Sequence, residues 1–283
     1  MGVAVPRRDQ GPDFIEALAR GLDVIRSFGA GPTRRTLSEV AGATGLARPT
    51  ARRVLLTLAE LGYVRTTGKL HELTPRVLDL GMAYIGAQDL WELARPHLAA
   101  LVAQTGESSS ISRLDGSDIV YTARVAVPKI IALRVEIGTR FPAGVTSQGR
   151  VLLAHLPPER LTEVLATPSR SGVQPWAELS AGALRESLCR VHADGWALAD
   201  NELAPGVRSI AVPLRDGEGR VLAAMNVTTH AAETEISTLT DVYLPLLLRT
   251  ARAISADWAL WQERPQSLQG GPDTAPRPLP SSL

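Results

Sequence analysis

The chain has 283 residues, which is enough for two domains that each bury a core, since one domain typically holds roughly 100 to 200 residues. Hydrophobic residues make up 45% of it and charged residues 21%, which argues against a fibrous chain or a largely disordered one. It contains no run of about 18 apolar residues, and its first residues lack the apolar core of a signal peptide. We therefore expect no membrane segment and a cytoplasmic protein.

The net charge of +1 hides an asymmetry along the chain. Residues 1–71 carry eleven Arg or Lys against six Asp or Glu, a net charge of +5, which leaves −4 for the rest. A basic N-terminal part joined to a slightly acidic larger part is the layout expected when only the first part meets nucleic acid, although solvated faces also vary freely in charge.

Three helices are predicted in the N-terminal part. Residues 14–28 place the apolar Ile15, Leu18, Leu22, Ile25 and Phe28 at steps of three and four, as in an amphipathic helix with one face in the core. Thr36 precedes a short second helix and has a glutamate three residues later, which is the spacing of a capping box, and a glycine at position 45 closes the turn. A third helix begins near Pro49 and stops at Gly62.

The third helix resembles a DNA-recognition helix in its charge pattern. At 100° per residue its arginines face away from the apolar side, and Thr67-Gly68 beyond the helix favours a small β-wing. Helix, helix, turn, helix and hairpin in this order predict a winged helix-turn-helix over 14–74. Arginine can bind guanine edges in the major groove, and hydroxyls and cations can bind phosphates. The candidate DNA-binding residues are Arg34, Arg35, Arg48, Thr50, Arg52, Arg53 and Lys69. The alternative is that these are solvated surface side chains.

The sequence after residue 74 predicts a linker, a sensor domain and a tail. Residues 75–89 form a helical pattern that is apolar nearly all round, so we expect this linker helix to pack against another chain or domain. Residues 90–262 mix helices at 147–156, 158–166, 180–194 and 239–262 with hairpins, which indicates an α/β effector-binding domain with a largely antiparallel sheet. KIIALRVEIG, ending at residue 138, is predicted to add a strand. Residues 1–13 are expected to be flexible and 263–283, rich in Pro, Gly and Ser, disordered. The fold class is therefore α+β.

An anion site is expected at the start of the helix at 147–156. Thr146, Ser147, Gln148 and Gly149 precede an apolar helix, whose free backbone N–H groups favour a carboxylate. An ordinary N-cap is the alternative explanation for the two hydroxyl residues. Further along the chain, Asn226 and Thr228 share one strand face inside an apolar run, where a ligand or a neighbouring loop could be their hydrogen-bond partner.

The stretch LARGLDVIRSFGAGPTRRTLSEVAGATGLARPTARRVLLTLAELGYVRTTGKLHELTPRVLDLG resembles the DNA-binding domain and linker of the IclR family of bacterial regulators. GTRFPAGVTSQGRVLLA and GWALADNELAPGVRSIAVPLRDGEGRVLAAMNVTTH resemble the C-terminal domain of the same family, so the resemblance spans about 14–260. LTPRVLDLG and LWELARPHL are most similar to the branch that controls aromatic-acid breakdown by the β-ketoadipate route.

This resemblance implies a regulator of a catabolic operon that binds a palindromic operator in double-stranded DNA. It also implies a homodimer or a dimer of dimers, a tetramer, and a GAF-like domain that binds a small organic or aromatic acid. The effector-binding positions carried over are Ser147, Gln148, Gly149, Asp200, Ser209, Asn226 and Thr228. Asp200 could instead brace the loop at Gly206. The proline-rich tail is an addition to the family pattern, and the expected pocket residues Val145, Gln148 and Val207 identify no particular effector.

No motif predicts catalysis, a metal or a cofactor. The five histidines are scattered, and the chain has no HExxH, no GxSxG and no GxxxxGK[ST] motif. The single cysteine, Cys189, excludes an intramolecular disulfide and multi-cysteine zinc sites, and its helical setting predicts a packing role. We therefore expect a protein that is not an enzyme. The alternative to a metabolite sensor is a winged-helix regulator whose C-terminal domain responds to a protein partner.

Overall fold

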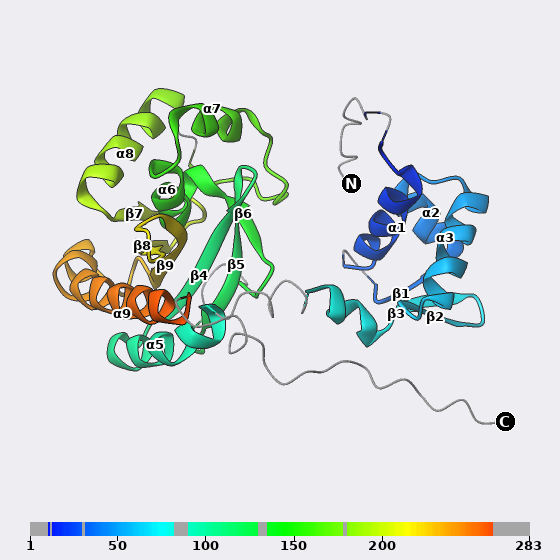
Figure 1. The fold of residues 1–283 in the computed structure, drawn as a ribbon, viewed down its shortest axis with the longest axis horizontal. Coiled ribbons are helices and arrows are strands. Elements are labelled where there is room, and N and C mark those ends of the chain that lie inside the picture. Colours follow the sequence, from blue (N-terminus) through cyan, green and yellow to red (C-terminus); the bar gives the residue numbers. More distant parts are fainter. Residues whose placement is uncertain are drawn as a thin grey trace. The chain divides into compact units, whose positions relative to one another are not determined.

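A computed structural model describes residues 11, 13–29, 32–81, 90–129, 135–177 and 180–262. The chain divides between residues 88 and 89 into two compact units, which are described separately (Figure 1). The predicted tail, most of the predicted N-terminal flexible segment, the linker at 82–89 and the core of the predicted strand at 130–134 lie outside the described residues.

The helices of the first unit are α1 (Glu16–Ser27), α2 (Leu37–Thr44) and α3 (Arg48–Glu60). The predicted capping box is confirmed: the Glu39 backbone N–H donates to the Thr36 hydroxyl, and the Thr36 backbone N–H donates to the Glu39 carboxylate at 2.7 Å. Gly45 ends α2 with φ 66°, a left-handed conformation that glycine adopts without a steric cost. These local signals fix the turn between α2 and α3.

A three-stranded antiparallel sheet completes this unit, in the order β1-β3-β2. β2 (Val64–Thr67) and β3 (Leu70–Leu73) form the predicted hairpin, with Gly68 in its turn at φ 62°. β1 (Arg34–Thr36) pairs with β3 and was not predicted, because a three-residue strand has too short a pattern to be recognised. Beyond β3, residues 75–77 form a 3₁₀ turn and 78–81 are helical.

The core of this unit uses only the C-terminal part of the predicted apolar face of α1. Val24 of α1 and Phe28, which directly follows the helix, are buried with the apolar side chains of α2, α3 and β2. Of the five predicted apolar positions, Ile25 and Phe28 pack in this core, whereas Ile15, Leu18 and Leu22 are exposed. The helix is amphipathic as expected, but its apolar stripe is only partly used within the described residues.

The second unit is built on a six-stranded antiparallel sheet in the order β6-β5-β4-β9-β8-β7. The sequence prediction of a largely antiparallel sheet is confirmed. Its strands are β4 (Ser108–Asp115), β5 (Asp118–Val125), β6 (Arg140–Pro142), β7 (Ala197–Asp200), β8 (Val207–Arg215) and β9 (Val221–His230).

Helices cover both faces of this sheet (Figure 1). One face carries α6 (Ser147–Ala154), preceded by a 3₁₀ turn at Ala143–Val145, with α7 (Pro158–Ala166) and α8 (Ala181–Asp194) beyond it. The other face carries α5 (Leu90–Thr105) and α9 (Leu244–Gln262), which pack against each other. The main cluster of buried side chains lies between the sheet and α6, so α6 is the central element of its layer.

Two local predictions differ from the structure in this unit, and a third agrees with it in part. The predicted strand ending at residue 138 has no strand in its described part, where residues 137–138 form a turn. Cys189 is exposed on α8, so the prediction of a packing role is wrong. The last helix was predicted to be interrupted at Pro245. The helix changes type at this point: residues 236–237 are α-helical, Thr238–Tyr243 form a π-helix, and α9 follows with Pro245 as its second residue, which lacks the N–H needed for a regular ladder. No helix among the described residues is long and apolar enough to span a membrane.

Gly149 sets how closely α6 approaches the preceding turn. A Cβ atom built on Gly149 would lie 2.1 Å from the backbone oxygen of Ala143, a contact that the backbone must move to relieve. We expect Gly149→Ala to lower the free energy of unfolding by about 1–3 kcal/mol. Gly182→Ala on α8, where an added Cβ meets nothing within 4 Å, should leave it unchanged or slightly raised. Urea unfolding of both variants tests this, and equal stability of the two would contradict it.

Candidate DNA-binding surface and ligand cavity

The outer face of α3 carries the cations predicted from the sequence. Arg48, Arg52 and Arg53 are exposed, and Thr50 is half-buried. In the described part of the chain none of these arginines forms an ion pair with an acidic side chain. Their charges are therefore available to an external anion.

The β-sheet of the same unit separates the two neighbouring arginines of β1. Arg34 is exposed and its Nε donates to Glu72 of β3 at 2.8 Å. Arg35 points to the opposite face, because side chains alternate along a strand, and only 9% of it is exposed. The expectation that Arg35 is a surface DNA contact is therefore not supported by this conformation. Lys69 lies exposed in the hairpin turn, at the tip of the wing as predicted.

A cavity of about 30 Å³ lies in the second unit between the start of α6 and the sheet. It brings together six of the eight predicted effector-binding residues: Thr146, Ser147, Gln148, Ser209, Asn226 and Thr228. Tyr121 and Arg124 of β5 also line the cavity. The remaining lining residues are apolar: Val135, Phe141, Val145, Ala199, Leu203 and Val207.

The start of α6 supplies polar groups to this cavity. The Thr146 hydroxyl caps the helix by accepting from the Gly149 N–H at 3.1 Å, so the N-cap explanation holds for this residue. Ser147 is hydrogen-bonded to Ser209 of β8 at 2.7 Å, and the Gln148 amide donates to two strand carbonyl groups at 2.9 and 3.0 Å. The side-chain oxygen of Gln148 is buried without a partner among the described residues. It can accept a further hydrogen bond.

An ion pair holds α6 in this position. Arg150 is 6% exposed, and its guanidinium bonds to Glu202 and to the backbone oxygens of Gly144 and Leu198. These contacts tie the helix to its preceding turn and to β7. A buried ion pair of this kind favours one arrangement of its neighbours, because removing either partner leaves an uncompensated charge.

The floor of the cavity is a polar row on neighbouring strands. The Asn226 side chain accepts from the Ser110 N–H at 3.2 Å and donates to Thr228 at 2.8 Å, so these residues share a face as predicted. Next to them, the Arg124 Nη1 donates to the Ser110 hydroxyl at 2.8 Å. The polar groups thus run from β5 across β4 to β9.

Arg124 is the cation of this cavity, and the sequence analysis missed it. Burial lowers the pKa of the guanidinium from its ordinary value, with nearby Tyr121 opposing this effect. Its Nε is buried without a hydrogen-bond partner, and no carboxylate pairs with it among the described residues. The positive charge of Arg124 is therefore not balanced by a neighbouring negative charge. A bound anion would supply that charge and a hydrogen-bond acceptor.

A β-bulge explains why strand alternation did not reveal Arg124. Ala123 pairs with Ile111 but Tyr121 pairs with Ser112, so Thr122 is an extra residue in β5. Tyr121 and Arg124 are three positions apart and would lie on opposite faces of a regular strand. The bulge brings both into the cavity lining.

The remaining two predicted effector-binding residues do not line the cavity. Gly149 packs against the backbone of Ala143. Asp200 pairs with Arg208 at 2.7 Å and accepts from Asn201, whose own side chain accepts from the Gly206 N–H. Asp200 therefore braces the Gly206 loop, which was the alternative considered for it.

The cavity combines a cation and hydrogen-bonding groups on one side with apolar and aromatic walls on the other. This arrangement suits a small organic anion with an apolar body. Within the described ranges, no group of three or more His, Cys, Asp and Glu is placed to hold a metal ion. A cation-bearing recognition helix in one unit and a polar cavity in the other define the class of ligand-responsive transcription regulators.

Comparison with known protein families makes this class specific. Residues 17–68 match the IclR helix-turn-helix domain, and residues 82–256 match the bacterial transcriptional regulator IclR C-terminal domain. The chain belongs to the IclR family of bacterial transcriptional regulators, and the predicted resemblance is confirmed.

Relatives extend over most of the chain. The Pca regulon regulatory protein of Pseudomonas putida is 38% identical over 242 residues, covering 85% of this chain and 83% of that protein. A transcriptional regulator of Rhodococcus sp. RHA1 has a solved structure with 46% identity and a TM-score of 0.76, covering 87% of this chain and 99% of that one. An IclR homologue from Microbacterium hydrocarbonoxydans, solved in complex with 4-hydroxybenzoate, has 26% identity and a TM-score of 0.75, covering 86% and 99%.

Tyr121 makes the stability of the folded chain depend on pH in the alkaline range. Burial raises the pKa of Tyr121 to about 12, with Arg124 opposing the shift, so its phenol is a neutral hydrogen-bond donor near pH 7. The unfolded chain loses this proton near pH 10 and the folded chain only near 12. Stability should therefore fall as pH rises through this window.

We expect the wild-type protein to lose up to about 2–3 kcal/mol more stability than Tyr121→Phe between pH 10 and 12. Urea unfolding at several pH values measures the difference, and the other tyrosines cancel because both proteins contain them. Parallel losses in the two proteins would contradict the assignment.

Proposed function

We propose that this regulator controls a catabolic operon in response to a small aromatic acid whose carboxylate binds Arg124. The observation that carries the proposal is the guanidinium in the cavity lining that has a buried Nε without a partner. Arginine binds carboxylates through charge-assisted hydrogen bonds, which are roughly twice as strong as neutral ones. The solved relative in complex with 4-hydroxybenzoate supports an aromatic acid as the ligand class.

The acid would occupy the cavity with its ring against the apolar walls. Tyr121 and Phe141 meet edge to face there, with ring centroids 5.8 Å apart. A cavity of about 30 Å³ has room for one water-sized group, whereas a benzene-sized ligand needs roughly 150 Å³. Binding therefore requires the apolar walls to move outward, and such an opening would slow association relative to a preformed pocket.

A larger hollow of about 550 Å³ in the first unit is a less suitable effector site. It is lined by apolar side chains of α1 and α3 together with Leu80, and Arg20 and Arg53 are among its polar members. In its lining, the described residues include no buried polar atom without a partner. We assign this groove and the exposed apolar stripe of α1 to contact with a second copy of the chain, in a homodimer or a dimer of dimers.

The division of labour follows from these sites. Residues 14–74 bind a palindromic operator and residues 90–262 bind the acid. Residues 75–89 form the linker between these two domains, so that ligand binding changes the affinity for the operator. Relatives of the chain are regulators, and we propose that this protein acts in the cytoplasm, where operator DNA lies, and is not an enzyme.

Arg124→Gln should separate ligand binding from stability. A ligand at one hundred times its dissociation constant stabilises the native protein by about 2.7 kcal/mol, so a panel of small aromatic acids should raise the unfolding temperature of the wild type. We expect Arg124→Gln to bind the best acid about 10- to 100-fold more weakly, because a charge-assisted hydrogen bond is lost. Without ligand it should be about as stable, since a half-buried cation whose Nε lacks a partner is removed.

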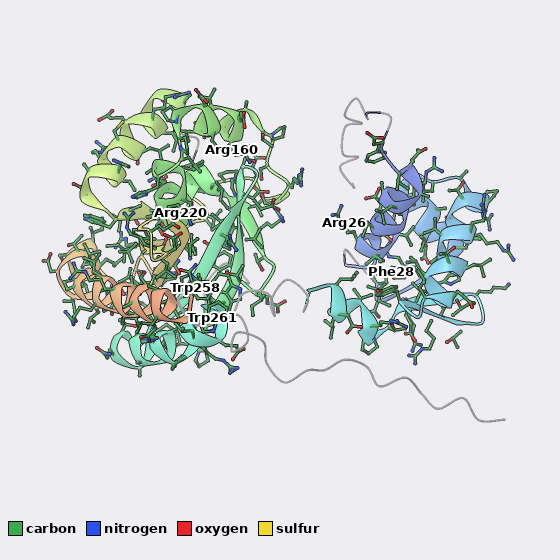
Figure 2. All side chains as sticks on the ribbon, viewed as in Figure 1. Arg26, Phe28, Arg160, Arg220, Trp258 and Trp261 are labelled. Atoms are coloured by element: carbon green, nitrogen blue, oxygen red, sulfur yellow. The ribbon has the colours of Figure 1, made fainter. Side chains whose placement is uncertain are left out.

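The matched control is Arg160→Gln on α7, an exposed arginine labelled in Figure 2 that pairs with Glu163. It should keep wild-type ligand binding. If no acid shifts the unfolding temperature of the wild type, the proposal fails in favour of a regulator that responds to a protein partner. If Arg124→Gln keeps full binding, the carboxylate is held elsewhere.

The recognition helix gives a second prediction. Arg52→Ala should weaken binding to the DNA upstream of the regulated operon by about 5- to 100-fold if Arg52 contacts a base, and should reduce discrimination against a scrambled duplex. If it contacts a phosphate, both duplexes should weaken alike and the salt dependence should flatten. Fluorescence anisotropy measures both, with Arg26→Ala on α1 as the control. Wild-type affinity of Arg52→Ala would remove this residue from the interface.

A further inference from the structure

The three-stranded sheet of the first unit carries a row of three charged side chains, Arg34, Glu72 and Arg65, called here the Arg-Glu-Arg row. In the antiparallel register Arg34 of β1 and Arg65 of β2 both pair with Glu72 of the central strand β3. Directly paired residues project from the same face of a sheet, so all three side chains lie on one face. The neighbouring Val64 points the other way into the core, so the row lies on the outer face.

Glu72 binds both arginines at once. Its Oε2 accepts from the Arg34 Nε at 2.8 Å, and its Oε1 accepts from the Arg65 Nε at 2.8 Å and Nη2 at 2.6 Å. The two arginine side chains lower the pKa of this carboxyl, chiefly through the hydrogen bonds from Arg65, so Glu72 stays charged. The carboxylate thus fixes two guanidinium groups side by side.

Both guanidinium groups remain accessible beyond these contacts. The Glu72 side chain is 16% exposed, whereas those of Arg34 and Arg65 are 60% and 69% exposed. Of the five N–H donors of each guanidinium, the hydrogen bonds to Glu72 use one on Arg34 and two on Arg65. The row therefore presents a net positive charge with several donors facing solvent.

Simple charge attraction to DNA does not account for Glu72. Isolated ion pairs between exposed side chains contribute little to stability, whereas a bidentate pair within a network, as here, contributes more. A carboxylate on a surface that meets DNA also repels phosphate. Ordering the arginines in advance gives Glu72 a role, since a preorganised guanidinium loses less side-chain freedom when it binds.

The Arg-Glu-Arg row lies where a winged-helix domain can contact the sugar-phosphate backbone of DNA. Arg65 lies on the hairpin whose turn contains Lys69, and β2 packs against α3, the recognition helix. When such a helix occupies the major groove, adjoining parts of the domain bind the sugar-phosphate backbone. Two fixed guanidinium groups suit phosphate oxygens, which arginine can bind through paired N–H groups.

We propose that the Arg-Glu-Arg row is a phosphate-binding element of the DNA interface, in which Arg65 contacts the backbone and Glu72 is a positioning residue. The proposal rests on DNA binding by this domain and adds Arg65 and Glu72 to it. Removing a negative charge from a DNA-binding surface ordinarily strengthens binding. The proposal predicts the opposite for Glu72: removing its negative charge weakens DNA binding.

The test measures binding of the full-length chain to a labelled mixed-sequence duplex by fluorescence anisotropy at a series of salt concentrations. Glu72→Gln should bind about threefold or more weakly than wild type, because the arginines lose their fixed orientation. Arg65→Gln should bind more weakly and reduce the slope of log affinity against log salt by about 0.9, the value for one phosphate contact. Circular dichroism confirms that each variant is folded.

Two controls carry the same charge changes elsewhere in the unit. Glu16→Gln removes an exposed acid of α1 that pairs with Arg20, and Arg26→Gln removes an exposed base of α1 that Figure 2 labels. Glu16→Gln should not weaken binding, and Arg26→Gln should keep the wild-type salt slope. Glu72→Gln binding as tightly as wild type, or more tightly, overturns the positioning role. An unchanged salt slope in Arg65→Gln overturns the contact. Failure of the wild type to bind the duplex would overturn DNA binding itself.

Discussion

The incompletely compensated guanidinium of Arg124 is the constraint on which the sensing unit depends. A cation with a buried nitrogen that lacks a partner is unfavourable unless something supplies the missing contact, and its described neighbours offer only the Ser110 hydroxyl. The bulge in β5 keeps Arg124 beside the cavity. The folded domain therefore keeps this unfavourable free energy when no ligand is bound. In the proposed mechanism an organic anion supplies the missing contact on binding, so occupancy of the cavity would raise the stability of the native state.

The opposite wall depends on close packing. Gly149 allows α6 to lie against the turn at Ala143, and the Arg150–Glu202 ion pair ties the same helix to the β7 side of the sheet. The helix start therefore holds Ser147 and Gln148 over the polar floor formed by Asn226 and Thr228. Rigid support of this kind makes a cavity selective, because its polar groups cannot turn to follow an unsuitable ligand.

The sequence predicted most of this molecule where the signals are local. The capping box at Thr36, the glycine turns at Gly45 and Gly68, and the polar pair Asn226 and Thr228 are short-range patterns with a direct physical meaning. Arg124 was missed because a bulge changes the face to which it points, and a bulge depends on pairing with a distant strand. Arg35 was assigned to the surface for a similar reason, since the three-residue β1 exists only through its pairing with β3.

The most direct test of the account compares the acid that gives the largest thermal shift with its neutral carboxamide, which has nearly the same shape. Isothermal titration calorimetry of both compounds with the wild type and with Arg124→Gln gives four affinities. If the guanidinium holds the carboxylate, the wild type prefers the acid strongly and Arg124→Gln loses most of that preference. If the preference for the acid is the same in both proteins, the charge of the ligand is recognised elsewhere and the central claim is wrong.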